Sequence, residues 1–461
     1  MSIRSLFQAR DMTLGSPWRR IMEFSIPMLL GNLAQQLYNT ADSIIVGKFV
    51  GDNALAAVGS ASPILNLLLA LFVGISTGAG IVVSQSFGAR DRKGLTESIG
   101  NCIALSAVAS VIIMIVGPLM TMPLLKLLGT PASIIDWCAD YLNIYFLGIV
   151  GFFFYNMLSG VLRGLGDSVS ALGFLLVAAF LNVVLDLWYV RQMGVAGVAL
   201  ATVISQAISA VLCYIKLAKM TEHFDLSFKT MRIVPSMAMR ILRIGIPSGI
   251  TQAIMAMAGM VVMNLTNRMG ETVIACNVII MRVDGFAMMP NFTFGQAMSV
   301  YTGQNVGACK FDRVDKGVKL GSFIALAFAT VNTTVLLFCG HILFGFFTET
   351  PELIDLAVRM IRIMAVGYIC IAVTQVLGGV MRGAGDTVTP MWISIISTIV
   401  LRVPTAYLLA YLTRSAEFPH GEPLALFSSL MISWTLGMII SVIVFRLGRW
   451  RKKMMEATDG I

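Results

Sequence analysis

The chain has 461 residues, of which 57% are hydrophobic and only 12% are charged. A water-soluble domain of this length could not cover its surface with so few charged side chains, so the composition excludes an ordinary soluble protein. The net charge of +9 could suggest a nucleic-acid-binding protein. However, the basic residues are not clustered with aromatic residues on one surface, so we expect no nucleic-acid partner.

Apolar stretches of the chain repeatedly reach the ~20 residues that a helix needs to cross a lipid bilayer. Such stretches form helices because the lipid interior offers no hydrogen-bond partners to the backbone. We therefore predict an all-α integral membrane protein with twelve transmembrane helices. The predicted spans are 22–47, 54–84, 97–122, 135–160, 169–190, 195–218, 240–266, 272–302, 317–345, 355–380, 388–412 and 424–446.

The distribution of charge predicts how the chain is oriented in the membrane. Residues 1–20 are rich in Arg and have no apolar core, which is not typical of a cleavable signal peptide. Most of the 33 Lys and Arg residues fall in the N-terminal segment, in alternate loops and in the C-terminal tail. This positive-inside pattern places both termini in the cytoplasm, and we expect a multi-pass protein of the bacterial plasma (inner) membrane.

The second half of the chain repeats the first. Pro27 recurs as Pro247, and the segment 158–167 matches the segment 377–386 at seven of ten positions without a gap. Six spans in each repeat predict two pseudo-symmetric six-helix lobes in the same orientation, and transporters of this kind bind substrate between the halves. The predicted parts are a cytoplasmic segment 1–20, an N-lobe 21–218, a linker 219–239, a C-lobe 240–447 and a cytoplasmic tail 448–461.

The repeated Arg-Gly-x-Gly-Asp motif begins at Arg163 and again at Arg382. A nucleotide site is a weak interpretation because no strand precedes the motif and the Walker pattern is absent. We expect a tight turn at each motif, in which a Gly supplies positive φ and the Asp caps the next helix.

Polar residues within the first predicted span lie on one side of a helix. Gln35, Asn39 and Asp42 fall within about a third of its circumference at 100° per residue. Tyr38 precedes Asp42 by one turn and could form a hydrogen bond with it. The alternative is that Asp42 lies near the outer end of the span and is simply hydrated.

The fifth span carries Asn182 and Asp186 one turn apart on one face. Asn156 and Thr202 could complete an oxygen-rich pocket with these residues and Asp42, although such residues often only join packed helices. Two carboxyl groups removed from water are costly unless they hold a proton or a cation. A sodium ion could bind Asp42, Asn182 and Asp186, since hard cations prefer oxygen ligands. The scattered Cys and His residues indicate no other metal site.

The second half contributes candidates for contact with substrate. Asp284 shares a face of span eight with Met281 and Met288, and span seven carries Gln252. Methionine is flexible and polarisable, so these side chains could form an adaptable wall, or they could simply fill apolar space. With Gln35 and Asn39 of span one, they are our candidate substrate-binding residues.

No motif of an enzyme is present: the chain lacks a Gly-x-Ser-x-Gly elbow, a His-Glu-x-x-His pair and a CxxC pair. It also lacks an ATP site. We therefore expect no enzymatic activity and no cofactor, and a proton or sodium gradient as the source of energy.

The order of these features resembles the multidrug and toxic compound extrusion (MATE) transporters from end to end. The resemblance rests on the six-plus-six repeat, on Asp42 late in span one, on the segments 85–89, 163–167 and 194–202, and on Ile-Pro at the start of each half. It implies antiport of small organic cations against protons or sodium. It also implies a coupling pocket in the N-lobe that matches Tyr38, Asp42, Asn156, Asn182, Asp186 and Thr202.

Some of these transporters have an essential Glu in span seven, but this chain has no acid between residues 240 and 266. Asp284 is then the candidate acid of the second half. The alternative function is a flippase or exporter of a lipid-linked or other amphipathic metabolite. An anionic substrate would need cationic residues in the cavity, and we expect only Arg282 to be well placed, because Arg402 and two other Arg residues fall near span ends. We expect a monomer with the bilayer and small organic cations as its partners.

Overall fold

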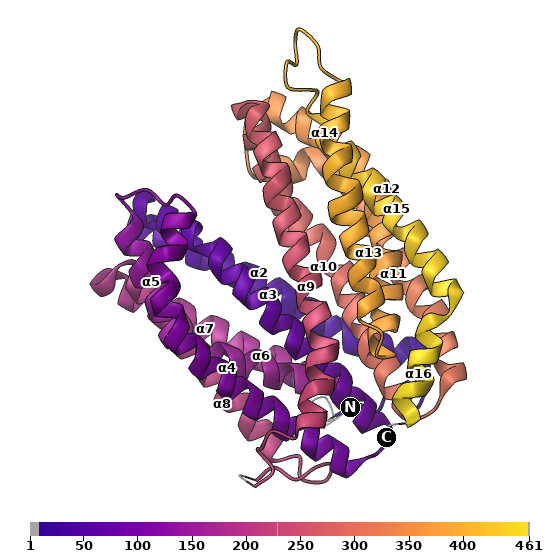
Figure 1. The fold of residues 1–461 in the computed structure, drawn as a ribbon. Helices are drawn as coiled ribbons and strands as arrows, with labels where there is room; N and C mark the ends of the chain where they lie inside the picture. Colours follow the sequence, from indigo (N-terminus) through magenta and orange to yellow (C-terminus); the bar gives the residue numbers. More distant parts are fainter. Residues whose placement is uncertain (1–8, 228, 460–461) are drawn as a thin grey trace. The chain divides into compact units, whose positions relative to one another are not determined.

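The computed structural model describes residues 9–227 and 229–459, and in this part of the chain every regular element is a helix (Figure 1). The first eight and last two residues, which belong to the predicted cytoplasmic segments, lie outside the described residues. The helices are α2 Pro17–Phe49, α3 Asp52–Gly88, α4 Arg92–Leu127, α5 Ile135–Leu147, α6 Ile149–Gly164, α7 Ser168–Met193, α8 Val195–Ala218, α9 Pro235–Arg268, α10 Glu271–Gly307, α11 Phe311–Gly345, α12 Pro351–Gly383, α13 Val388–Ile395, the π-helix η1 Ile396–Arg402, α14 Val403–Leu412, α15 Leu424–Leu447 and α16 Arg449–Asp459.

Among the described helices, ten are long and apolar enough to cross a membrane, and the bent pair α5–α6 adds an eleventh span. The mean hydropathy of α2 is too low for this group, because polar side chains are interspersed with its apolar ones. Counting α2 as a further span gives the twelve that the sequence predicts.

The chain forms two compact units. The first contains Glu23–Gly249, and the second contains Thr13–Met22 and Ile250–Gly460. Two helices therefore change unit along their length: α2 after its first turns, and α9 after Gly249. A proline, Pro27 in α2 and Pro247 in α9, lies within five residues of each change.

In the first unit, α6 packs against α3, α4 and α8, and α8 packs against α7. The rings of Phe72 and Phe153 stack in its core with centroids 3.6 Å apart. The beginning of α9 crosses α3 at glycines, because a Cβ on Gly78 would lie only 2.5 Å from the backbone nitrogen of Gly245. Small residues allow helices in a membrane to pack this closely.

The predicted fourth span is not one straight helix. It consists of α5 and α6, which meet at Gly148 with a bend of 53°. A Cβ at Gly148 would lie 2.8 Å from the Cβ of Val203 on α8, so a residue without a side chain is needed for this approach. The bend was not predicted because a single Gly in an apolar run does not by itself indicate a break.

Both Arg-Gly-x-Gly-Asp motifs form the expected turns. Gly166 and Gly385 have positive φ, of 83° and 93°. The Asp167 carboxylate accepts a hydrogen bond from the Ser170 backbone N–H at 2.9 Å, and the Asp386 carboxylate caps the next helix in the same way at 3.1 Å. These contacts give the motif a structural role at the start of a helix.

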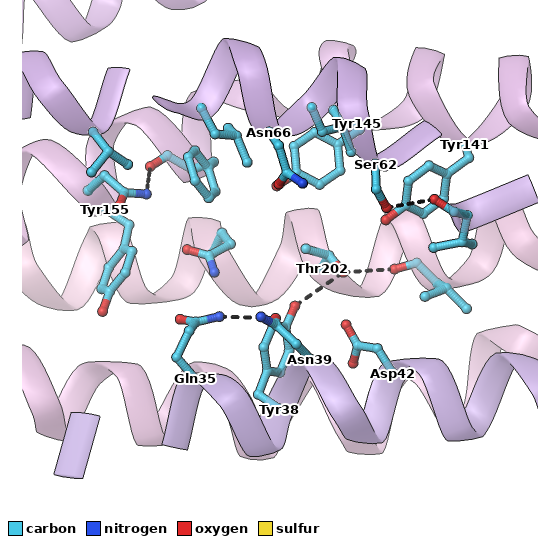
Figure 2. A pocket seen from close by; sticks show the side chains of 18 of the residues that line it. Gln35, Tyr38, Asn39, Asp42, Ser62, Asn66, Tyr141, Tyr145, Tyr155 and Thr202 are labelled. Atoms are coloured by element: carbon cyan, nitrogen blue, oxygen red, sulfur yellow. Dashed lines mark hydrogen bonds between the residues drawn. The ribbon is translucent and has the colours of Figure 1, made fainter. Parts of the chain in front are cut away.

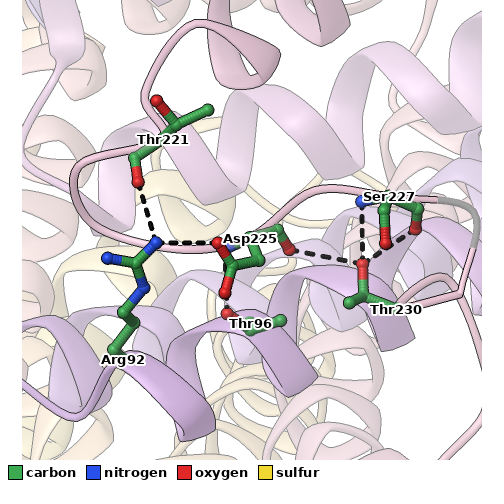
Figure 3. Close-up of polar contacts among 6 residues, drawn as sticks. All are labelled: Arg92, Thr96, Thr221, Asp225, Ser227 and Thr230. Carbon is green, nitrogen blue, oxygen red and sulfur yellow. Dashed lines mark hydrogen bonds and ion pairs between the residues drawn. The ribbon is translucent and has the colours of Figure 1, made fainter.

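The linker between the repeats is held against the first unit (Figure 3). The Arg92 guanidinium donates to the Asp225 carboxylate at 2.7 Å and to the Thr221 carbonyl at 3.1 Å. The Asp225 backbone N–H donates to the hydroxyl of Thr96 at 3.0 Å. Asn101, which is fully buried, accepts the backbone N–H of residue 234 at 2.9 Å. The described residues of the linker therefore pack as part of this unit.

In the second unit, α12 packs against α10, α11 and α15. The apolar run 388–412 is interrupted by η1, and Arg402 ends this π-helix ten residues before Leu412. The expectation that Arg402 lies near a span end is therefore wrong. Arg402 lies well inside the apolar run 388–412.

Candidate functional site

The polar face of α2 lines a cavity of about 540 Å³ within the first unit (Figure 2). Gln35, Tyr38, Asn39 and Asp42 all contribute to its wall, as the helical spacing of the sequence predicts. The other lining residues come from α2, α3, α5, α6 and α8, and they are Val46, Val58, Ser62, Leu65, Asn66, Leu69, Val73, Tyr141, Tyr145, Phe152, Tyr155, Asn156, Val198, Thr202 and Gln206.

Thr202 is the centre of the hydrogen bonds at this site. Its hydroxyl accepts the Tyr38 hydroxyl at 3.4 Å and the Asn182 amide at 3.3 Å, and it donates to the Val198 carbonyl at 3.1 Å. Tyr38 therefore contacts Thr202 on α8 and also lies near Asp42 of its own helix. The three contacts join α2, α7 and α8 at one point.

Asp42 and Asp186 lie close enough to interact with each other, although they come from α2 and α7. Asp186 and Asn182 are fully buried, and Asp42 is half-buried. One carboxyl oxygen of Asp42, both of Asp186 and the amide oxygen of Asn182 are buried and have no hydrogen-bond partner among the described residues. Unsatisfied buried oxygens are costly and rare in native proteins, so this cluster indicates a site for a proton or a cation.

The oxygen cluster contains only two acidic groups. Within residues 9–227 and 229–459, no three His, Cys, Asp or Glu side chains come together in a way that could hold a metal ion. A sodium ion at Asp42, Asn182 and Asp186 would thus depend on amide and hydroxyl oxygens as well as carboxylates. Such neutral oxygens suit a hard monovalent cation better than a tightly bound transition metal.

The predicted coupling residues gather at this site. Tyr38, Asp42, Asn156 and Thr202 line the cavity. Asn182 and Asp186 on α7 do not line it but contact residues of its wall: the Asn182 amide donates to Thr202, and Asp186 interacts with Asp42. The Asn156 amide donates to the Phe152 carbonyl at 2.9 Å.

The predicted substrate residues divide between the units. Gln35 and Asn39 line the cavity, where the Gln35 amide donates to the Asn39 oxygen at 3.3 Å. The other four, Gln252, Met281, Asp284 and Met288, belong to the second unit and do not line this cavity. Gln252 and Met281 are exposed, Met288 is buried, and Asp284 is half-buried.

The sequence reasoning missed several side chains of the cavity. Tyr141 and Tyr145 lie one turn apart on α5, and Tyr155 follows on α6. Gln206 lies one turn after Thr202 on the same face of α8, with a buried amide oxygen that lacks a described partner. The i, i+4 spacing of the two tyrosines and of Thr202 with Gln206 was the available signal.

The comparisons with known proteins agree with this architecture. The family model MatE matches residues 27–188 and again residues 247–408, so the two matches start 220 residues apart. The chain is 30% identical over 450 residues to the probable multidrug resistance protein YpnP of Bacillus subtilis (strain 168), which covers 96% of this chain and 98% of the relative. It is 27% identical over 408 residues to the probable multidrug resistance protein YoeA of the same organism, covering 87% of this chain and 88% of the relative.

A solved structure shows the same fold. It is described as the outward-facing conformation of a multidrug resistance MATE family transporter of the MOP superfamily. The two structures superpose with a TM-score of 0.89 at 23% sequence identity, and the match covers 97% of this chain and 98% of the other chain. The predicted fold class, twelve transmembrane helices in two related lobes, is thus confirmed, and so is the absence of enzymatic function that membership of a transporter family implies. On the evidence of its fold, its repeated family match and its relatives, the chain belongs to the MATE family of multi-pass membrane transporters.

Proposed function

We propose that the protein is a secondary active multidrug efflux antiporter that exports small organic cations in exchange for protons or sodium. The observation that carries this proposal is the cluster of unpartnered oxygens of Asp42, Asn182 and Asp186 beside a cavity of about 540 Å³. The relatives that are named multidrug resistance proteins support the export of varied compounds.

The cavity favours cationic, partly aromatic substrates. Its wall combines the carboxyl group of Asp42 with the rings of Tyr141, Tyr145 and Phe152. Aromatic faces and a carboxylate attract a delocalised organic cation, while the amides of Gln35 and other residues supply adaptable polar contacts. No Lys or Arg is among the residues that line the cavity, which disfavours an anionic lipid-linked substrate here.

Exchange would follow from competition for the same acids. An ion at Asp42 and Asp186 cancels the charge that attracts a cationic drug, so occupancy by the ion favours release of the drug. Because Asp42 and Thr202 contact groups on different helices, ion binding can also favour one arrangement of α2, α7 and α8 over another. Antiport by alternating access requires that drug and ion each prefer one conformation.

We further propose that the protein works as a monomer in the bacterial plasma membrane with both termini in the cytoplasm. The distribution of Lys and Arg supports this orientation. It makes the segment 219–239 a cytoplasmic connection between two functional lobes.

Purified protein in liposomes tests the proposal. A pH gradient and a sodium gradient are imposed separately, and transport of ethidium is followed by fluorescence. We expect one of the two ion gradients to drive transport of ethidium against the ethidium concentration gradient. An ionophore that dissipates that ion gradient should abolish the transport. Failure of both gradients to drive ethidium or a second organic cation would contradict ion-coupled export.

A further inference from the structure

The last helix of the chain, α16, begins directly after the last apolar span (Figure 1). The span α15 ends at Leu447, and Gly448 follows with a φ of 75°, the left-handed conformation that ends a helix and permits a sharp turn. The helix α16 then starts at Arg449. Because only one residue separates the two helices, α16 must lie at the surface of the membrane that α15 crosses.

One side of α16 is fixed to the second unit. Trp450 and Met454, one turn apart, are only 1% and 6% exposed. The Trp450 ring stacks on Phe445 with centroids 4.7 Å apart, and its Nε1–H donates to the Phe445 carbonyl at 3.0 Å. The Arg451 guanidinium donates to the Asp315 carboxylate on α11 at 2.9 Å, and α16 also packs against α10 and α15. These contacts determine which side of α16 faces outward.

The outward side of α16 is basic. At 100° per residue, Lys452 lies opposite the midpoint between Trp450 and Met454. Arg449 lies about 60° from Lys452 around the helix, and both side chains are exposed. The burial of the apolar residues therefore turns these two cations away from the protein.

The segment 446–453 contains five Lys and Arg residues and no acid. Two of the five, Arg451 and Lys453, form ion pairs with carboxylates of the protein. The other three are exposed and form what we call the basic surface, which consists of Arg446, Arg449 and Lys452. Its charge is thus concentrated at the junction of a span and a helix on the membrane surface.

Exposed apolar side chains adjoin the basic surface. Leu447 at the end of α15 is 69% exposed, and Met455 on α16 is 54% exposed. Met455 lies about 60° from Lys452, on the side away from Arg449. Basic and apolar side chains exposed together on one helix are typical of helices that lie in the membrane interface.

We propose that the basic surface binds the headgroups of anionic phospholipids, with phosphatidylglycerol as the model. Clusters of about four to eight Lys and Arg residues beside a span attract such headgroups, whereas a zwitterionic headgroup has no net charge to attract. An acidic protein would also be attracted by the charge, but lipid additionally supplies acyl chains for Leu447 and Met455. The inference does not depend on which compounds the protein exports.

The purified full-length protein in a neutral detergent provides the test. Phosphatidylglycerol or phosphatidylcholine with the same acyl chains is added, retained lipid is counted by native mass spectrometry, and the thermal midpoint is measured. The test variant changes all three residues of the basic surface to Gln. The control variant removes the same charge from three exposed residues on α4, α9 and α12, by Lys126→Gln, Arg268→Gln and Arg362→Gln.

We expect the wild type to retain phosphatidylglycerol in preference to phosphatidylcholine and to be stabilised by it. One basic residue near an anionic surface changes affinity by about fivefold, so the test variant should lose at least about tenfold of this preference. The control variant should lose less than about twofold. At about 0.5 M salt the preference of the wild type should decrease, because salt screens exposed charges.

Equal retention of phosphatidylglycerol by the wild type and the test variant would overturn the proposal. Equal losses in the test and control variants would also overturn it, since net charge alone would then explain the effect. Stabilisation by soluble glycerol phosphate to the same extent would indicate a site for free phosphate, and an effect of polyglutamate without one of phosphatidylglycerol would indicate an acidic protein partner.

The thermal midpoint without added lipid shows whether the test variant is folded. If it is not, Lys452→Gln alone decides the question, with an expected loss of about fivefold in the preference and a contradiction if the preference is unchanged. Because no readout involves ethidium, failure of the proposed export would leave this result intact, and loss of lipid preference would leave export intact.

Discussion

The exchange of Asp42 for Asn tests the centre of the proposed mechanism. The substitution keeps the size and most hydrogen-bonding capacity of the side chain but removes its charge. At an effective dielectric constant of about 20, two unit charges ~4 Å apart interact by roughly 4 kcal/mol. Because about 1.4 kcal/mol corresponds to a factor of ten, loss of this charge should weaken cation binding by about a thousandfold.

Ethidium transport by the Asp42→Asn protein in liposomes should therefore fall to background under the gradient that drives the wild type. Stability should not fall, because the side chain has a buried oxygen without a partner and lies beside a second acid. The thermal midpoint of the purified variant in detergent measures its stability. Asp140→Asn changes an exposed acid on α5 and should leave both transport and stability unchanged.

The reasoning would be refuted by an Asp42→Asn protein that transports ethidium at the wild-type rate with the same dependence on the ion gradient. Loss of transport together with a large loss of thermal stability would show that Asp42 has a structural role. Retained ion binding with lost drug transport would assign Asp42 to the drug and leave Asp186 as the ion site.

Three further predictions concern packing and hydrogen bonds. Thr202→Val removes the acceptor of two hydrogen bonds and should cost about 1–3 kcal/mol, measured as a lower thermal midpoint together with slower transport. Gly78→Leu should greatly lower the yield of monodisperse protein because the helix crossing leaves no room for a side chain, whereas Gly59→Leu, where a Cβ meets nothing within 4 Å, should purify normally. Asn101→Leu should destabilise the protein by about 1–3 kcal/mol because it leaves the half-buried backbone N–H of Val234 unpaired, whereas Asp225→Asn removes only an exposed ion pair and should cost about 1 kcal/mol or less. Equal thermal midpoints for the last two variants would contradict that ranking.

The sequence predicted the parts of the site that depend on helical spacing. Gln35, Tyr38, Asn39 and Asp42 share one face of α2 because side chains three, four and seven positions apart must do so. The spacing of Asn182 and Asp186 is predictable for the same reason. Hydrophobic spans and the repeat likewise follow from composition and order alone.

The other parts depend on which helices pack together and where a helix deviates from regular geometry. Tyr38 pairs with Thr202 because α2 lies next to α8, which spacing within α2 does not indicate. The bend at Gly148 brings the tyrosines of α5 to the cavity, and an isolated glycine does not predict it. Arg402 lies at the end of a π segment, and such segments have no sequence signature.

The change of unit within α2 and α9 has a consequence for how such a molecule can arise. The first four turns of α9 pack in the unit formed by the preceding repeat, and residues 17–22 at the start of α2 group with the other unit. A single repeat made as a separate polypeptide would therefore lack a helical segment that only a second copy could supply. We expect an ancestral half-length protein to have been stable only as a domain-swapped pair. For the same reason, co-expressed fragments should assemble when the break lies in the segment 219–234, and neither fragment should be stable alone.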